Sequence, residues 1–227
     1  MTTTSHWPQF VDLLARHGVT CVLDVGANAG QYAVRLRQSG FGGRIVSFEP
    51  GAEAHAALTQ AAAADPDWQV APRAAVGAAA GTLTLNVSPE SDMSSLLPFT
   101  AEARRHMDSA TFVGTETVDV VALADVWAEH VRADDRAFLK SDTQGYEAQV
   151  LAGLGARLDE LAGVQFECSL VPVYAGQPDW RELLDRLATY GLVPHLIVPG
   201  YYSRHYGRMV EFDAVCFRET DLPAPAR

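Results

Sequence analysis

Positive charge is scarce in this sequence. Lys and Arg make up only 17 of its 227 residues, against 28 Asp and Glu, so the formal net charge is −11. Proteins that bind nucleic acid or anionic membrane surfaces do so through clustered Lys and Arg. The composition therefore argues against both kinds of partner. A hydrophobic share of 48% is also too high for a disordered chain.

Cysteine is rare as well, and long apolar runs are missing. Cys21, Cys168 and Cys216 are widely spaced and lie in apolar runs, which predicts buried free thiols rather than disulfides or a zinc site. No segment reaches the roughly 18 apolar residues of a membrane span. The N-terminal MTTTSHWPQF lacks the basic start and apolar core of a signal peptide. We therefore expect a cytoplasmic protein without a membrane span.

Apolar runs of strand length alternate with helical patterns along much of the chain. Buried strands are predicted at residues 20–25, 44–48, 68–71, 137–140 and 164–168. Helices are predicted at residues 31–38, 53–64, 147–152 and 180–190. This order is typical of an α/β fold with a doubly wound, mostly parallel sheet. Because no repeat or composition break divides the chain, we predict a single domain over residues 1–227.

The remaining segments depart from this alternation. Residues 1–19 are expected to hold a helix, and residues 81–122 an irregular insertion with edge strands. Residues 192–218 are predicted to form a hairpin, whose loop at 199–208 we expect near the functional site. Residues 220–227 are expected to be a frayed tail.

A glycine-rich loop, DVGANAG, joins the first predicted strand to its helix. In a doubly wound sheet, this loop borders the ligand crevice. Gly26 would let the backbone approach a ligand, and Gly30 would let the helix pack close to its strand. Glu49, at the tip of the second strand, can accept hydrogen bonds from both ribose hydroxyls of a nucleoside. The pattern therefore predicts a nucleoside site.

The acid at the start of this loop narrows the choice of ligand. A dinucleotide site usually shows G-x-G-x-x-G, whereas Asp24 here precedes G-x-x-x-G and would repel a pyrophosphate. Asp24 would instead attract a cation such as an amino group. Together with Glu49, it fits S-adenosylmethionine better than NAD. A structural alternative stays open, in which the glycines only shape a tight turn and Asp24 caps the helix.

A second acidic group follows the strand that ends at Lys140, in the motif SDTQGYE. Carboxylates crowded at one edge of a sheet raise each other's pKa unless a cation compensates. Lys140 or a divalent metal could supply that charge, and Asp142 with Glu167 on the neighbouring strand are the candidate Mg²⁺ ligands. In the structural alternative, Asp142 caps the following helix and Glu147 supports its first turn.

Four segments together, VLDVGANAGQYA, SFEP, FLKSDTQGYEAQVLAG and FECS, resemble the FkbM-type S-adenosylmethionine-dependent methyltransferases. The resemblance extends to the closing EFDAVCFR. It implies a Rossmann-like, seven-stranded class I methyltransferase fold with its last strand antiparallel. It also implies that residues 91–97, SDMSSLL, close over the cofactor, although a polar surface loop is the alternative. The expected cofactor-binding residues are Asp24, Gly26, Ala27, Asn28, Gly30, Glu49, Pro50, Ala75, Ser94 and Asp142.

Methyl transfer to a hydroxyl requires alignment of the reacting atoms and a group that takes the proton. Asp142 is the first candidate for this catalytic base, with the metal-ligand role as its alternative. His205 is the second candidate, because the surrounding YYSRHYGR would give a flat aromatic wall for a sugar or ring. The alternative for His205, and likewise for His106, is an exposed loop histidine.

The predicted function is S-adenosylmethionine-dependent O-methylation of a hydroxyl on a sugar, polyketide or other natural-product or glycoconjugate substrate. An N-methyltransferase of the same fold, an NAD(P)-dependent oxidoreductase and a non-catalytic nucleotide-binding module are the alternatives. The missing G-x-G-x-x-G and the presence of Asp24 disfavour the oxidoreductase. The expected partner is a small molecule or glycoconjugate, and a homodimer stays open.

Overall fold

A seven-stranded sheet forms the centre of the computed structural model, which describes residues 6–107 and 109–219. The strands lie in the order β3-β2-β1-β7-β8-β12-β9. Their bounds are β1 (Cys21–Val25), β2 (Arg44–Phe48), β3 (Trp68–Val70), β7 (Ala137–Ser141), β8 (Gly163–Ser169), β9 (Leu192–Pro199) and β12 (Glu211–Arg218). The pairs from β3 through β8 are parallel, whereas β12 runs antiparallel to both of its neighbours. The predicted fold class is therefore confirmed.

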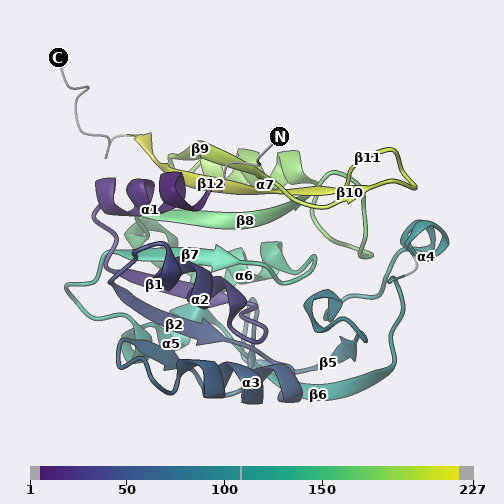
Figure 1. Ribbon diagram of the computed structural model, residues 1–227, viewed down its shortest axis with the longest axis horizontal. Helices are drawn as coiled ribbons and strands as arrows, with labels where there is room; N and C mark the ends of the chain where they lie inside the picture. Colours follow the sequence, from purple (N-terminus) through teal and green to yellow (C-terminus); the bar gives the residue numbers. More distant parts are fainter. Residues whose placement is uncertain (1–5, 108, 220–227) are drawn as a thin grey trace.

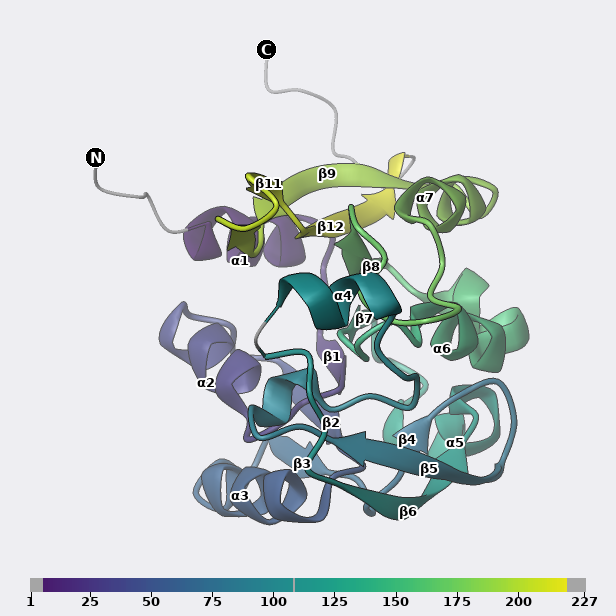
Figure 2. The same cartoon turned by 90° about the vertical axis from the view of Figure 1, so that its right-hand side faces the viewer.

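Helices cover both faces of this sheet (Figures 1 and 2). One face carries α1 (Trp7–Arg16), α2 (Gln31–Gln38) and α3 (Ala52–Ala62). The other carries α5 (Leu123–His130), α6 (Glu147–Leu154), the 3-10 helix η2 (Gly155–Glu160) and α7 (Trp180–Ala188). This arrangement explains the unbroken apolar strands, because a strand between two helical layers is buried on both sides.

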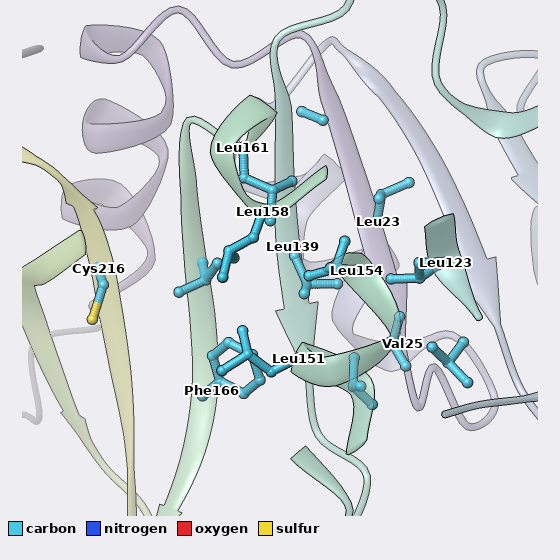
Figure 3. Packing of buried hydrophobic residues seen from close by; sticks show 14 of the residues in the cluster. Leu23, Val25, Leu123, Leu139, Leu151, Leu154, Leu158, Leu161, Phe166 and Cys216 are labelled. Atoms are coloured by element: carbon cyan, nitrogen blue, oxygen red, sulfur yellow. The ribbon is translucent and has the colours of Figure 1, made fainter. Parts of the chain in front are cut away.

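Strand β7 illustrates the double burial. Phe138 packs in the cluster with Phe10 of α1 and Phe217 of β12, whereas the next residue, Leu139, packs in the opposite cluster. Figure 3 shows this second cluster, in which leucines of α6 and η2 lie over Leu139 and Phe166. The three cysteines are buried and free, as predicted.

The insertion at 81–122 builds a second, smaller sheet. It contains β5 (Gly81–Val87) and β6 (Gly114–Val121), and the short β4 (Ala75–Val76) completes the order β4-β6-β5. Edge strands were predicted within 81–122, but no strand was predicted at the position of β4. A two-residue strand is too short for an apolar pattern, and β4 exists because it pairs with the distant β6.

Between these strands, the chain forms a cap at the carboxyl ends of β1, β2 and β7. The cap contains the 3-10 helix η1 (Ser91–Met93) and α4 (Ala101–His106). Its apolar core joins Phe99 to Tyr174, with ring centroids 5.0 Å apart, and includes Val173. The backbone N–H of Thr100 donates to the Val173 carbonyl at 2.8 Å. The insertion is thereby fixed to the segment that follows β8.

The final hairpin is present as predicted, since β9 pairs with β12. Its loop carries a small ribbon of β10 (Tyr202–Ser203) and β11 (Arg208–Met209). Among the described residues, none of the helices has the length and apolar character needed to span a bilayer. The predicted tail at 220–227 lies outside the described residues.

Candidate functional site

A cavity of about 370 Å³ lies beneath the cap. It opens at the carboxyl ends of β1, β2 and β7, the edge at which ligands bind in doubly wound sheets. Eight of the expected cofactor-binding residues line it: Gly26, Ala27, Asn28, Glu49, Pro50, Ala75, Ser94 and Asp142. The structure therefore brings together residues from five separate segments of the sequence.

Two glycines of the DVGANAG loop have different roles. Gly26 has φ +72°, and a Cβ there would lie 1.8 Å from the carbonyl oxygen of Asp142, so the two loops meet through this glycine. Gly30 has φ +88°, and a Cβ there would lie 2.8 Å from the ring of Trp68. Gly30 does not line the cavity, and the close packing that it permits is with Trp68 of β3, whereas packing against its own strand β1 was expected.

Glu49 is held at the cavity wall by the backbone. Its two carboxylate oxygens accept hydrogen bonds from the N–H groups of Asn28 and Gly51, both at 2.8 Å. Burial raises the pKa of Glu49, although these hydrogen bonds and Lys140 act in the opposite direction. Asn28 adopts φ +48°, and its side-chain oxygen accepts a hydrogen bond from Ser91 of the cap at 3.0 Å. A carboxylate fixed in this way is preorganised to receive hydroxyl groups.

Asp24 lies behind the wall of the cavity. Its carboxylate is fully buried, 3.0 Å from Nζ of Lys140, and it accepts a hydrogen bond from the Ser47 hydroxyl at 3.2 Å. The cation beside Asp24 is therefore an internal lysine. The helix-capping alternative is wrong, because α2 is preceded by Gly30 and no side chain caps it.

Lys140 connects the two loops. Besides the ion pair with Asp24, its ammonium group donates to the Gly26 carbonyl at 2.8 Å and lies 5.2 Å from the centre of the Tyr32 ring. Burial alone would lower the pKa of Lys140, but Asp24 and Asp142 outweigh it and raise the pKa. The side chain thus remains charged although it is only 4% exposed.

Asp142 and Glu167 are bridged by an amide. Gln144 Nε2 donates hydrogen bonds to Asp142 Oδ1 at 2.8 Å and to Glu167 Oε2 at 3.1 Å. The Tyr174 hydroxyl donates a hydrogen bond to Gln144 Oε1 at 2.7 Å. Burial, followed by the charge of Asp142, raises the pKa of Glu167. A Mg²⁺ ion between the two carboxylates would have to displace this amide. Within residues 6–107 and 109–219, no group of three or more His, Cys, Asp and Glu is arranged to hold a metal.

Glu147 supports the SDTQGYE loop from below. It is 3% exposed, and its Oε1 accepts hydrogen bonds from the Thr143 N–H at 2.9 Å, the Thr143 hydroxyl at 3.0 Å and the Gly145 N–H at 3.3 Å. Burial raises the pKa of Glu147 to about 7. The structural alternative holds for Glu147, whereas Asp142 does not cap α6, whose preceding residue is Tyr146.

The SDMSSLL segment lies over the cavity, as the resemblance implied. Ser91 bonds to Asn28 of the first loop, and Ser95 donates to the Gln144 carbonyl of the second at 2.7 Å. Ser94 lines the cavity and accepts a hydrogen bond from the Ser88 N–H at 3.1 Å. The cap is therefore attached to both loops.

His205 lies away from the cavity wall. Its Nε2 is 2.5 Å from Nδ1 of His106 on α4, and its side chain is exposed. The pair lies where the 199–208 loop meets the cap, which matches the alternative of an exposed loop histidine.

Among the cavity residues that were not predicted as site residues, four lie together. Trp7, Tyr32, Gln165 and Asp213 line the cavity from α1, α2, β8 and β12. The Tyr32 hydroxyl donates to Gln165 Oε1 at 3.0 Å, and Gln165 is hydrogen-bonded to Asp213. A signal did exist, because Gln165 and Asp213 are polar residues flanked by apolar residues within their strands. The sequence alone does not show that these two strands are adjacent.

Comparison with known proteins gives the same fold. The chain matches the crystal structure of EvdMO1 (TM-score 0.50, 12% identity, 95% of this chain and 41% of that one). It also matches magnesium protoporphyrin IX methyltransferase from Synechocystis PCC 6803 with bound SAM (TM-score 0.51, 10% identity, 93% and 76%). A third match is TrmK from M. capricolum in complex with S-adenosyl-homocysteine (TM-score 0.50, 7% identity, 96% and 70%).

Sequence comparison identifies the family. A search of curated protein sequences finds no match. The profile of the Methyltransferase FkbM domain, however, matches residues 24–193, which include both loops of the cavity and more than half of the chain. This chain therefore belongs to the FkbM methyltransferase domain family.

Proposed function

We propose that this chain is an S-adenosylmethionine-dependent O-methyltransferase that acts on a hydroxyl of a sugar, polyketide or other natural-product or glycoconjugate substrate. The observation that carries the proposal is the cavity beneath the cap, lined by Glu49 at the end of β2 and by Asp142 after β7. The Glu49 carboxylate can accept hydrogen bonds from the ribose hydroxyls of a nucleoside, and the Asp142 carboxylate can accept the proton of an acceptor hydroxyl. The family membership supports methyl transfer as the reaction.

The cavity offers polar and apolar groups that suit the cofactor. Glu49 offers a fixed carboxylate to the ribose hydroxyls, and Gly26 lets a ligand approach the loop. Phe48, Ala75 and Leu85 supply apolar surface for an adenine ring. When bound, S-adenosylmethionine supplies a methyl group on a positively charged sulfur. The bound SAM and S-adenosyl-homocysteine of two structural neighbours agree with this choice.

We assign the proton-accepting role to Asp142. A hydroxyl with a pKa of about 15 needs a base as its oxygen takes the methyl group. Asp142 lines the cavity, and the Gln144 amide fixes its carboxylate in one orientation. Asp142 would take the proton of the acceptor hydroxyl as the oxygen–carbon bond forms and the sulfur–carbon bond of the cofactor breaks, so that the sulfur would leave as a neutral thioether. His205 is not proposed for this step, because it pairs with His106 outside the cavity wall.

The proposal is tested with S-adenosylmethionine carrying a labelled methyl group, offered with a panel of sugar, polyketide and amine acceptors. Label on a hydroxyl oxygen is the expected result, and Asp142→Asn should abolish transfer while S-adenosylhomocysteine still binds. Label on nitrogen would identify the N-methyltransferase alternative. Tighter binding of NADH than of S-adenosylhomocysteine in calorimetry would refute the proposal.

The compartment is part of the same proposal. The buried, unpaired thiols of Cys21, Cys168 and Cys216 agree with a reducing environment, for which the cytoplasm is the proposed location.

A further inference from the structure

One wall of the cavity is built from residues to which the proposed function has so far given no role. Trp7 and Tyr32 lie with ring centroids 5.4 Å apart, Tyr32 bonds to Gln165 at 3.0 Å, and Gln165 is hydrogen-bonded to Asp213. We call these four residues the Trp7–Asp213 wall. Trp7 and Asp213 lie outside residues 24–193, the part that matches the family. Two of the four residues of this wall therefore lie outside the part of the chain that matches the family.

Among the described residues, the carboxylate of Asp213 forms no ion pair, although the charge of Lys140 acts to lower its pKa. Lys140 is already bound to Asp24 at 3.0 Å and to the Gly26 carbonyl at 2.8 Å. Asp213 instead lies directly opposite Glu167 in the register of β12 and β8. Burial, followed by the nearby charge of Asp142, raises the pKa of Asp213 to about 7. A positive group in the cavity would relieve this repulsion.

The aromatic side chains favour the same kind of ligand. The faces of Trp and Tyr rings attract cations, and Lys140 Nζ already lies 5.2 Å from the centre of the Tyr32 ring. An ammonium group beside a carboxylate also forms a charge-assisted hydrogen bond, which is stronger than a bond between neutral groups. A neutral hydroxyl could donate a hydrogen bond to the carboxylate, but it would gain neither the attraction between opposite charges nor the attraction to the ring faces.

We infer that Asp213 is a specificity-determining residue whose carboxylate receives an ammonium group of a ligand in the cavity, beside the rings of Trp7 and Tyr32. The inference rests on the proposed function, because the ammonium group belongs either to an amine-bearing methyl acceptor such as an amino sugar or to the amino-acid tail of S-adenosylmethionine. Gln165 holds the carboxylate in place through its hydrogen bond.

The test compares the wild type, Asp213→Asn and a control, Asp119→Asn, which makes the same change of charge at an exposed position of β6. Calorimetry gives the affinities for S-adenosylhomocysteine, which carries the ammonium group, and for 5′-methylthioadenosine, which lacks it. Initial rates with S-adenosylmethionine give kcat/KM for glucosamine and for its neutral relative N-acetylglucosamine. Thermal melting confirms folding, and Asp213→Ala is a second variant should Asp213→Asn not fold.

If the ammonium group belongs to the cofactor, Asp213→Asn should weaken the binding of S-adenosylhomocysteine by roughly tenfold or more and leave the affinity for 5′-methylthioadenosine unchanged. If the ammonium group belongs to the methyl acceptor, the affinities for both nucleosides should be unchanged. The preference in kcat/KM for glucosamine over N-acetylglucosamine should then fall roughly tenfold. The inference is overturned if Asp213→Asn changes neither the affinity for S-adenosylhomocysteine nor the preference for glucosamine. A wild type without any preference for glucosamine counts as an absence of the acceptor pattern. The proposed function fails separately, if the wild type and Asp119→Asn bind no S-adenosylhomocysteine.

Discussion

Replacing Gly26 by alanine tests whether contact between the two loops shapes the cavity. A Cβ at this position would lie 1.8 Å from the Asp142 carbonyl oxygen, where real contacts are almost never below 3.0 Å, so one of the loops must move by more than 1 Å. The positive φ of +72° adds a strain of about 1–2 kcal/mol. Overpacking adds about 1–3 kcal/mol. Gly26→Ala should therefore lower the free energy of unfolding by about 2–5 kcal/mol.

The functional loss should be larger than the loss of stability suggests. A displacement of about 1 Å at a reactive site can cost roughly a hundredfold in rate. We expect methyl transfer to fall by about this factor, and calorimetry with S-adenosylhomocysteine to show weaker binding, because Gly26 and Asp142 both line the cavity.

Gly40 provides the matched control. Its φ is +100°, but a Cβ there would meet nothing within 4 Å, so Gly40→Ala imposes backbone strain without a collision. Urea unfolding should show a loss of about 1–2 kcal/mol for Gly40→Ala, with unchanged binding. Equal losses of stability in the two variants, together with wild-type binding in Gly26→Ala, would refute the steric reasoning.

Other groups around the cavity give further expected outcomes. Glu49→Gln removes an acceptor for the N–H of Asn28 or Gly51, so S-adenosylhomocysteine should bind roughly tenfold more weakly in calorimetry, and unchanged affinity would contradict the role of Glu49. Lys140→Met leaves Asp24 buried without its cation and should cost about 3–5 kcal/mol in urea unfolding. Adding Asp24→Asn should restore part of this stability, and an additive double variant would show that the pair is not coupled. Burial raises the Glu147 pKa from 4.5 to about 7, so unfolding releases a proton between these pH values and stability falls as the pH rises through them. The loss should reach about 3 kcal/mol and be absent in Glu147→Gln, and parallel pH profiles of the two proteins would contradict it.

Prediction from the sequence succeeded where the signal is local. The strand at 44–48 and the helix at 31–38 have the predicted bounds, because their apolar patterns are complete within a few residues. The DVGANAG loop, Glu49 and Asp142 were predicted to meet because the carboxyl ends of parallel strands share one edge of a sheet.

The features that were missed depend on contacts distant in the sequence. β4 is a strand only because β6 lies beside it, some 40 residues away, as the register of Ala75 with Val120 shows. Asp24 was expected to face a ligand cation, but the Lys140 side chain reaches it from the neighbouring strand. Asp213 joins the cavity because β12 inserts between β8 and β9. Each of these contacts joins residues that are far apart in the sequence, so no local pattern of residues indicates it.

The attachment of the cap bears on how molecules enter and leave the cavity. Ser91 bonds to the loop that carries Gly26, and Ser95 bonds to the loop that follows Asp142. The same segment thus covers both the nucleoside end and the base. In the proposed reaction, a displacement of the cap that breaks both hydrogen bonds would expose the two ends together, so we expect the departing nucleoside product and the incoming acceptor to share one passage to solvent.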